Sequence, residues 1–86
     1  MAYQLIYAPR AEGEIAKLPR PVIQRILEAT LALATEPRPP GCQKLRGVPK
    51  AWRVRVGHYR ILYEVSDEAR VVRVARVGHR RDIYDR

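Results

Sequence analysis

The sequence predicts an α+β domain in which two helices cover one face of a mainly antiparallel sheet, in the order β-α-α-β-β-β. Residues 52–65 alternate apolar and polar side chains on both sides of Gly57 and His58, which is typical of a β-hairpin. Residues 22–36 repeat apolar side chains at intervals of three and four, which is typical of an amphipathic helix. The 86 residues suffice for one domain, so we expect residues 1–86 to form a single unit.

The first elements are predicted to be one strand and two helices. Residues 3–7 place apolar side chains at every second position, as a strand does. Pro9 suits the first turn of a helix, and residues 19–21 end that helix and begin the next. Two helices with so short a link are expected to form an antiparallel hairpin on the apolar side of the sheet. The expected apolar stripe of the second helix consists of Ile23, Ile26, Leu27, Leu31 and Ala34, with Thr30 on the same stripe and Leu33 off it.

The remaining elements follow a stiff connector at residues 37–41, which is rich in proline and cannot continue a helix. Leu45 is the expected apolar anchor of the next segment. Residues 66–69 read as a turn and residues 71–77 as a β-branched strand, which Gly78 is expected to end.

The hairpin sorts its side chains onto two faces if Gly57 and His58 form its loop. Glycine at the first loop position suits a type II′ turn. Arg55 then lies opposite Arg60, and like charges placed directly opposite each other destabilise a sheet. Two interpretations stay open: a solvated basic face, or arginines that converge on an anion. The side chains expected in the core are Trp52, Val54, Val56, Tyr59, Ile61, Tyr63 and Val65, and those expected on the other face are Arg53, Arg55, Arg60, Leu62 and Glu64.

The charge balance favours an anionic polymer as the partner. The net charge is +8, and residues 44–86 hold 12 basic and 5 acidic side chains. Such a lopsided basic charge is typical of nucleic-acid binding, and most of the basic residues are arginine, which grips phosphate with two parallel donors. One cysteine, Cys42, excludes an internal disulfide. Without a signal segment or an apolar run of membrane-spanning length, we expect a cytoplasmic protein.

The candidate chemistry is narrow. Cys42, His58 and His79 lack the spacing of metal ligands, and Ser66 has no histidine near it in the sequence. What remains is a group of arginines with tyrosines and histidines nearby. Such a group suits the attack of an RNA 2′-hydroxyl on its own phosphate, because arginines stabilise the charged transition state and a tyrosine or histidine can move protons. We therefore expect neither a metal nor another cofactor. If the strand at residues 71–77 pairs beside residues 59–65, Arg80 and Tyr84 emerge near the rim of the arginine face.

Four segments together resemble the RelE/ParE superfamily of toxins from type II toxin–antitoxin systems, and the RelE branch in particular. They are Lys44-Leu45-Arg46-Gly47, Trp52-Arg53-x-Arg55, Tyr59-Arg60-x-x-Tyr63 and Gly78-His79-Arg80-x-x-x-Tyr84. The resemblance covers nearly the whole chain. It implies a toxin that cleaves mRNA in the ribosomal A site, and a cognate antitoxin that neutralises the toxin by wrapping it.

The resemblance also implies roles for single residues. Arg60 and Arg80 match arginines that stabilise the transition state, and Tyr84 matches a C-terminal tyrosine that orients the substrate. Arg53 and Arg55 stand where RelE members have lysines, one of which is assigned a proton-transfer role, and an arginine holds charge there but stays protonated. The expected catalytic residues are Arg55, Arg60, Arg80, Tyr84 and His79, the last as an alternative proton carrier. The expected contacts to mRNA or to ribosomal RNA are Arg53, Lys44, Arg46, Lys50 and Arg81.

Two further interpretations concern the same chain. A ParE-like toxin would bind and inhibit DNA gyrase without cleaving RNA, and an inactive relative would only bind RNA. His58 is interpreted as a turn residue and Cys42 as incidental. Arg70, Arg73 and Arg76 are expected to be solvated strand residues or general RNA contacts.

Overall fold

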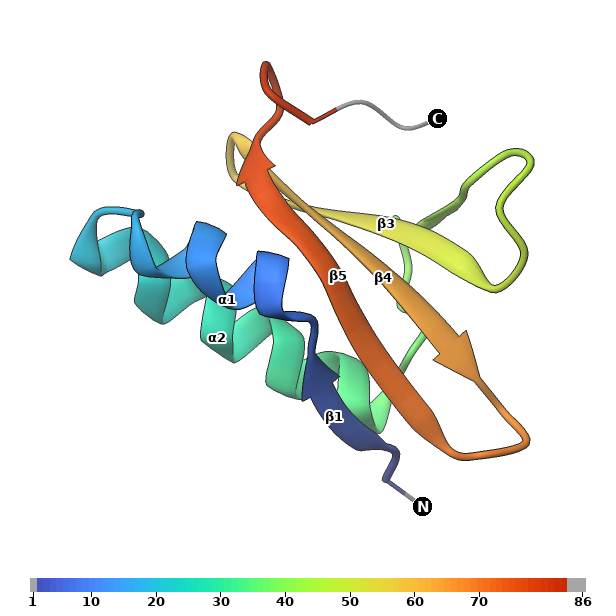
Figure 1. Ribbon diagram of the computed structural model, residues 1–86. Coiled ribbons are helices and arrows are strands. Elements are labelled where there is room, and N and C mark those ends of the chain that lie inside the picture. Colours follow the sequence, from blue (N-terminus) through green and yellow to red (C-terminus); the bar gives the residue numbers. More distant parts are fainter. Residues whose placement is uncertain (1, 84–86) are drawn as a thin grey trace.

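The computed structural model describes residues 2–83 and shows two helices packed against a five-stranded sheet (Figure 1). The elements are β1 (Gln4–Tyr7), α1 (Pro9–Ala16), α2 (Arg20–Thr35), β2 (Gln43–Lys44), β3 (Ala51–Val56), β4 (Tyr59–Ser66) and β5 (Val71–His79). This confirms the expected α+β order and adds the two-residue strand β2, which the sequence did not predict.

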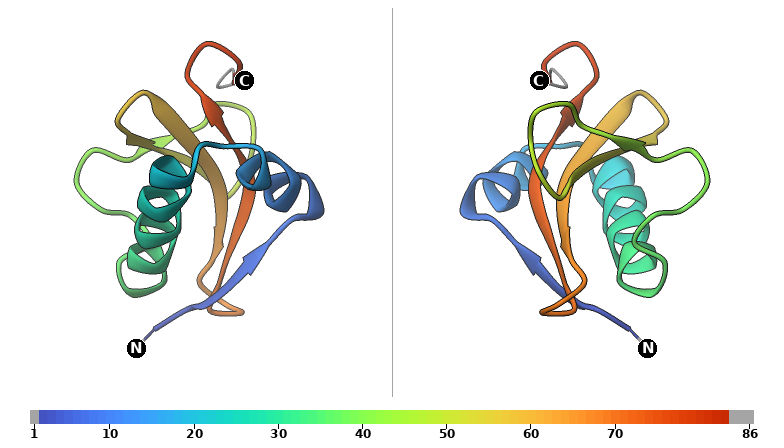
Figure 2. Two further views of the ribbon diagram at one scale, coloured as in Figure 1. Left: turned by 90° about the vertical axis from the view of Figure 1, so that its left-hand side faces the viewer. Right: turned by 90° about the vertical axis from the view of Figure 1, so that its right-hand side faces the viewer.

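The strands run in the spatial order β1-β5-β4-β3-β2, and both helices lie on one face of the sheet (Figure 2). Neighbouring strands are antiparallel except β1 and β5, which are parallel. The chain between β1 and the rest of the sheet forms α1 and α2, so the helical hairpin is part of a long connection that returns to the sheet at its opposite edge. The face covered by the helices is called the inner face below, and the opposite face the outer face.

The β3–β4 hairpin has the register that the sequence predicts. Arg55 pairs with Arg60, and the pairs on either side keep the same alignment along the whole of β3. Gly57 has a φ of 60°, and His58 is not among the residues with positive φ. This combination fits the type II′ turn, whose first loop residue alone needs a positive φ.

The inner-face core follows a stripe of α2 that differs from the expected one. Ile26, Thr30 and Leu33 are buried, whereas Leu31 is 62% exposed. Leu33 was expected off the stripe and Leu31 on it, so both expectations were wrong. Thr30 is buried as expected: its hydroxyl is bonded to the Tyr7 hydroxyl (2.6 Å) and donates to the Leu27 carbonyl (2.8 Å), so its polar group is satisfied. The buried face runs from Ile26 through Thr30 to Leu33, and this direction leaves Leu31 exposed.

Burial also shapes the centre of the sheet. Tyr63 is fully buried, and its hydroxyl donates to the carbonyl of Pro37 at 2.6 Å. Burial raises the pKa of the Tyr63 phenol above its usual value, so this tyrosine stays protonated. The fully buried residues around it are Ile26, Ile61, Val72 and Val74.

A second, smaller cluster lies on the outer face. It consists of Leu45, Ala51, Leu62 and Ile83, with Val48 packed against it. Leu45 is therefore the anchor that was expected. Gly78 does not end β5, which continues to His79, and its role is spatial: a Cβ on Gly78 would lie 2.8 Å from Cδ1 of Ile83. The missing side chain makes room for Ile83, which is 1% exposed, as the chain folds back over the sheet.

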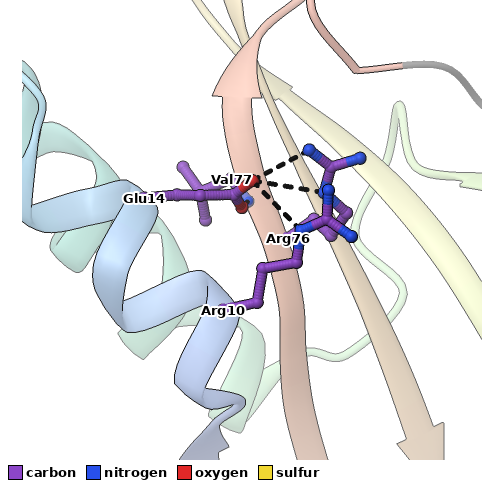
Figure 3. A network of polar contacts seen from close by, with 4 residues as sticks. All are labelled: Arg10, Glu14, Arg76 and Val77. Carbon is purple, nitrogen blue, oxygen red and sulfur yellow. Dashed lines mark hydrogen bonds and ion pairs between the residues drawn. The ribbon is translucent and has the colours of Figure 1, made fainter.

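Glu14 of α1 covers the edge of β5 where β1 ends (Figure 3). β1 pairs only with residues 71–74, and farther along the Val77 amide donates to Oε1 of Glu14 at 2.9 Å. Oε2 accepts from Nη2 of Arg76 at 2.8 Å, and Nε of Arg10 lies 3.6 Å away. Burial raises the pKa of Glu14, but the hydrogen bonds from Arg76 and Val77 and the positive charges outweigh burial, and the net pKa is lowered. Arg76 is thus paired rather than solvated.

We expect Glu14→Gln to lower the free energy of unfolding by about 1.5–3 kcal/mol, because the charged carboxylate accepts hydrogen bonds from Arg76 and from the Val77 amide. The lowered pKa makes this contribution fully present above pH 4.5, and it is lost as the pH falls through the folded-state pKa. Urea unfolding of both proteins at several pH values measures the difference. Glu12→Gln, on the exposed side of the same helix, is the control. A deficit that stays constant down to pH 2 would contradict this account.

We expect Gly78→Ala to destabilise the fold by about 1–3 kcal/mol through overpacking against Ile83. Combining it with Ile83→Val, which removes the Cδ1 atom in closest approach, should cost less than the sum of the two single changes. Urea unfolding of the four proteins of this cycle gives the coupling. Strict additivity would show that Ile83 does not occupy the space above Gly78.

Candidate functional site

The candidate site lies on the outer face, at the end of the sheet where β3 turns into β4. Arg55 and Arg60 are directly opposite each other in the hairpin register. Arg55 is exposed and Arg60 is partly buried. The intervening residues Val54 and Val56 pack against the inner core, so alternation along β3 directs the arginines outward. The structure thus brings together the two arginines that the sequence placed on one face.

Arg60 also meets the end of the described chain. It pairs with Gly78 of β5, and its Nη1 atom lies 3.4 Å from the carbonyl oxygen of Ile83. Because Ile83 is held by the outer-face cluster, this carbonyl is fixed beside the arginine. Tyr84, the next residue in the sequence and a predicted catalytic residue, lies outside the described residues.

Arg80 and Arg81 follow β5 and are both exposed. The backbone amide of Arg80 donates to the carbonyl of His58 at 2.9 Å. This bond ties the segment after β5 to the turn between β3 and β4. Arg80 therefore lies at the same end of the sheet as Arg55 and Arg60, which is the placement that the sequence predicts.

Arg53 is placed differently from a surface contact. It is 6% exposed, and its Nη2 donates to Oε1 of Gln43, its partner on β2. An arginine in this position contributes positive charge below the surface and holds β2 against β3. The expected direct contact of Arg53 with RNA is therefore less favourable than one of Arg55, which is exposed.

His79 is not brought together with the arginines. It pairs with Tyr59, whose side chain lies on the inner face, and the two rings meet edge to face at 5.4 Å between centroids. Its Nδ1 atom accepts from the amide of Arg81 at 3.2 Å. His79 therefore lies on the opposite face of the sheet from a phosphate held by Arg55 and Arg60, and a proton transfer between them would have to pass from one face to the other.

The three remaining basic candidates are Lys44, at the end of β2, and two residues of the loop between β2 and β3. Lys44 donates through Nζ to the carbonyls of Val48 (2.8 Å) and Leu45 (3.1 Å), so this lysine closes the loop on itself. Arg46 and Lys50 are exposed, and Lys50 has a φ of 64°, a left-handed conformation that is uncommon outside glycine. Arg46 and Lys50 are therefore the members of this group that present charge to a partner.

Several residues that shape the site were not singled out from the sequence. Gln43 was part of a connecting segment. Gly78 was expected only to end a strand, and its contact with Ile83 gave no signal because it joins a strand to the segment that folds back over the sheet. The Gly57–His58 turn was predicted, but not its bond to Arg80 or its neighbour His79. A hydrogen-bonding partner can be inferred from a sequence only when a local pattern fixes the distance between the two residues along the chain. No such pattern relates the residues of these contacts.

Within residues 2–83, no group of three or more His, Cys, Asp or Glu side chains is placed to hold a metal ion. In the same range, none of the helices combines the length and the apolar character that crossing a membrane requires.

Comparisons with known proteins identify the family of this chain. Residues 5–84 match the family described as the ParE toxin of the type II toxin–antitoxin system parDE. Toxin RelG of Mycobacterium tuberculosis is 33% identical over 87 residues, which covers 100% of both chains. The mRNA interferase toxin RelE of Escherichia coli K12 is 35% identical over 82 residues, covering 93% of this chain and 85% of that protein.

Solved structures show the same fold. The toxin–antitoxin complex RelBE2 of M. tuberculosis contains a chain with a TM-score of 0.82 and 29% identity, covering 93% of this chain and 100% of that one. The intact E. coli RelBE toxin–antitoxin complex gives a TM-score of 0.80 at 34% identity, with 91% and 96% covered. Since the family match spans nearly the whole sequence, this chain belongs to the RelE/ParE superfamily of type II toxin–antitoxin toxins, in its RelE-like branch.

Proposed function

We propose that this chain is an mRNA endonuclease that acts on translating ribosomes and needs no metal ion. The observation that carries the proposal is the position of Arg55 opposite Arg60 on the outer face, with Arg80 tied to the same end of the sheet. One relative in the comparisons, RelE of E. coli, is named an mRNA interferase. The structure adds a reason why this chain suits the same chemistry, since like charges that face each other are stabilised by an anion between them.

The proposed reaction uses the RNA as its own nucleophile. A ribose 2′-oxygen attacks the adjacent phosphorus and loses its proton, and the bond from phosphorus to the 5′-oxygen of the next nucleotide breaks. The products are a 2′,3′-cyclic phosphate and a 5′-hydroxyl, which takes up a proton. Arg55, Arg60 and Arg80 stabilise the negative charge that develops on the phosphate oxygens.

Tyr84 is the proposed carrier of a proton in this reaction. It directly follows Ile83, whose carbonyl lies beside Arg60, and a phenol can donate to a leaving oxygen. The arginines are unsuited to this task, because they stay protonated. Arg46 and Lys50 are proposed to contact the phosphate backbone of ribosomal RNA through their exposed charges.

We expect Arg60→Ala and Arg80→Ala each to slow cleavage by about 100- to 1,000-fold, the usual loss when one group that stabilises transition-state charge is removed. The measurement is the mapping of new 5′ ends in messages translated on purified ribosomes. Arg20→Ala, an exposed change at the start of α2, is the matched control and should cleave as the unchanged protein does.

Tyr84→Phe tests the role of the phenol separately, because it removes only the phenol oxygen. This variant should cleave more slowly while it still binds ribosomes. Uncut messages with the unchanged protein would contradict the nuclease proposal. Blocked replication with a DNA-damage response, indifferent to Tyr84, would favour the gyrase-binding alternative. Salt-sensitive RNA binding with no product at any concentration would indicate an inactive relative.

We further propose that a cognate antitoxin neutralises this toxin with an acidic, amphipathic segment. The outer face presents positive charge, and the helical face offers an apolar cavity of about 290 Å³ between α1, α2 and β1. Leu27, at the rim of this cavity, and the neighbouring Leu31 are exposed on α2. RelE proteins in two of the similar structures are complexed with antitoxins.

We expect Leu31→Glu to weaken the antitoxin complex by at least about fivefold, since it places a charge in the apolar contact. The toxin is coexpressed with the product of the neighbouring reading frame, and co-purification followed by a binding titration gives the affinity. Ala32→Glu, exposed on the next position of the same helix, is the control. Equal affinities of the two variants would place the contact elsewhere, and no complex at all would refute the antitoxin.

A further inference from the structure

Three rings gather at the tip of the β3–β4 hairpin, around the inner-face side of its turn. The His58 and His79 rings are nearly parallel, with an interplanar angle of 19° and 6.2 Å between centroids. The Tyr59 ring meets His79 edge to face, at 5.4 Å and 72°. We call His58, Tyr59 and His79 the ring cluster. His58 is exposed at the turn, whereas Tyr59 and His79 are partly buried beneath it.

The backbone holds the ring cluster in place. The carbonyl of His58 accepts from the Arg80 amide at 2.9 Å, and the carbonyl of His79 accepts from the Asp82 amide at 2.8 Å. The amide of Arg81 donates to Nδ1 of His79 at 3.2 Å, which orients that imidazole ring. A platform held in this way loses little conformational freedom when a planar ligand stacks on it.

The surroundings of the ring cluster are mostly positive. The guanidinium of Arg25 lies over the turn, with Nη2 3.1 Å from the position that a Cβ of Gly57 would take. Arg80 and Arg81 are exposed just beyond His79, and Asp82 is the acidic residue of the same turn. An exposed ring with guanidinium groups around it is the combination with which proteins bind unpaired bases, since the ring takes the base and the cations take the phosphates.

We propose that the ring cluster is a stacking platform for one unpaired base of single-stranded RNA, with His58 as the contacting ring. This inference rests on the proposed function, because the stacked base belongs to the same RNA strand whose phosphate is bound at the arginine site. The platform and the arginine site share the Arg80 segment, but they lie on opposite faces of the sheet at its hairpin end. An RNA strand that passes around this end places one phosphate at Arg55 and Arg60 and a neighbouring base on His58.

The platform assigns His79 a role other than proton transfer. Its ring lies nearly parallel to that of His58 and meets the Tyr59 ring edge to face, so His79 is a positioning residue. The platform also explains why a histidine suits the second loop position. A planar side chain there can stack on a base, whereas a residue that served only the turn would need no ring.

The test measures binding of a fluorescent single-stranded RNA hexamer whose 2′-O-methyl groups prevent cleavage. One base at a time is replaced by an abasic sugar, and anisotropy titrations give the affinity of each hexamer. For the unchanged protein, we expect one abasic position to weaken binding by between about fivefold and a hundredfold, the contribution of one stacked base. In His58→Ala this difference should disappear.

Two variants separate the effect of a ring from the effect of a charge. His58→Phe keeps a ring and should retain the dependence on the base, whereas His58→Lys supplies a cation without a ring and should lose it. If all hexamers bind the unchanged protein equally, if none binds, or if His58→Ala keeps the dependence, the platform is refuted. Arg60→Ala should retain the base dependence of hexamer binding while cleavage on ribosomes is slowed, so failure of the nuclease proposal and failure of the platform give different results.

Discussion

The register of the β3–β4 hairpin is the constraint on which the rest of the structure depends. Side chains alternate between faces along each strand, so a slip of one residue would exchange the whole set on one face for the set on the other. Such a slip would turn Arg55 and Arg60 toward the helices and expose Val54 and Ile61. The two-residue turn prevents it, because Gly57 adopts the positive φ that a type II′ turn requires. The core and the arginine site are therefore fixed by the same few backbone angles.

The arginine site has a structural cost, and other parts of the fold offset it. Arg55 faces Arg60 across two strands, an arrangement that weakens a sheet without a bound anion. The outer-face cluster around Leu62 and Ile83 supplies apolar burial beside these charges. At the opposite edge, Glu14 satisfies the Val77 amide and Arg76 where β1 no longer reaches. A locally unfavourable arrangement, such as two facing like charges, that is stabilised by the packing and hydrogen bonds around it is typical of functional positions.

The sequence predicted the parts of the fold in which apolar side chains recur at a short, regular spacing along the chain. Alternation gave the hairpin and its two faces, and proline positions gave the helix boundaries. On α2, Ile26 and Thr30 were correctly placed on the buried stripe, but Leu31 and Leu33 were placed on the wrong sides. Apolar character does not distinguish two leucines, and the bond between Thr30 and Tyr7, which fixes the buried face, joins residues far apart in the sequence. The packing of Ile83 over Gly78 and the capping by Glu14 were also missed, since each joins segments that no local pattern relates. The pairing of Arg55 with Arg60 was predicted correctly for the opposite reason, because strand register alone determines it.

The two faces at the hairpin end have different physical characters. The outer face offers guanidinium groups, which hold phosphate wherever it lies in a strand, and so provides charge without base recognition. The inner-face side offers the nearly parallel rings of His58 and His79, and the proposed base stacks on His58. Arg80 joins them, because its amide is bonded to His58 while its side chain is exposed. If RNA crosses this edge as proposed, the spacing between the stacked base and the phosphate is set by the backbone of one turn. A substrate would then be positioned by its own covalent geometry, with the arginines acting only on the phosphate that this spacing selects.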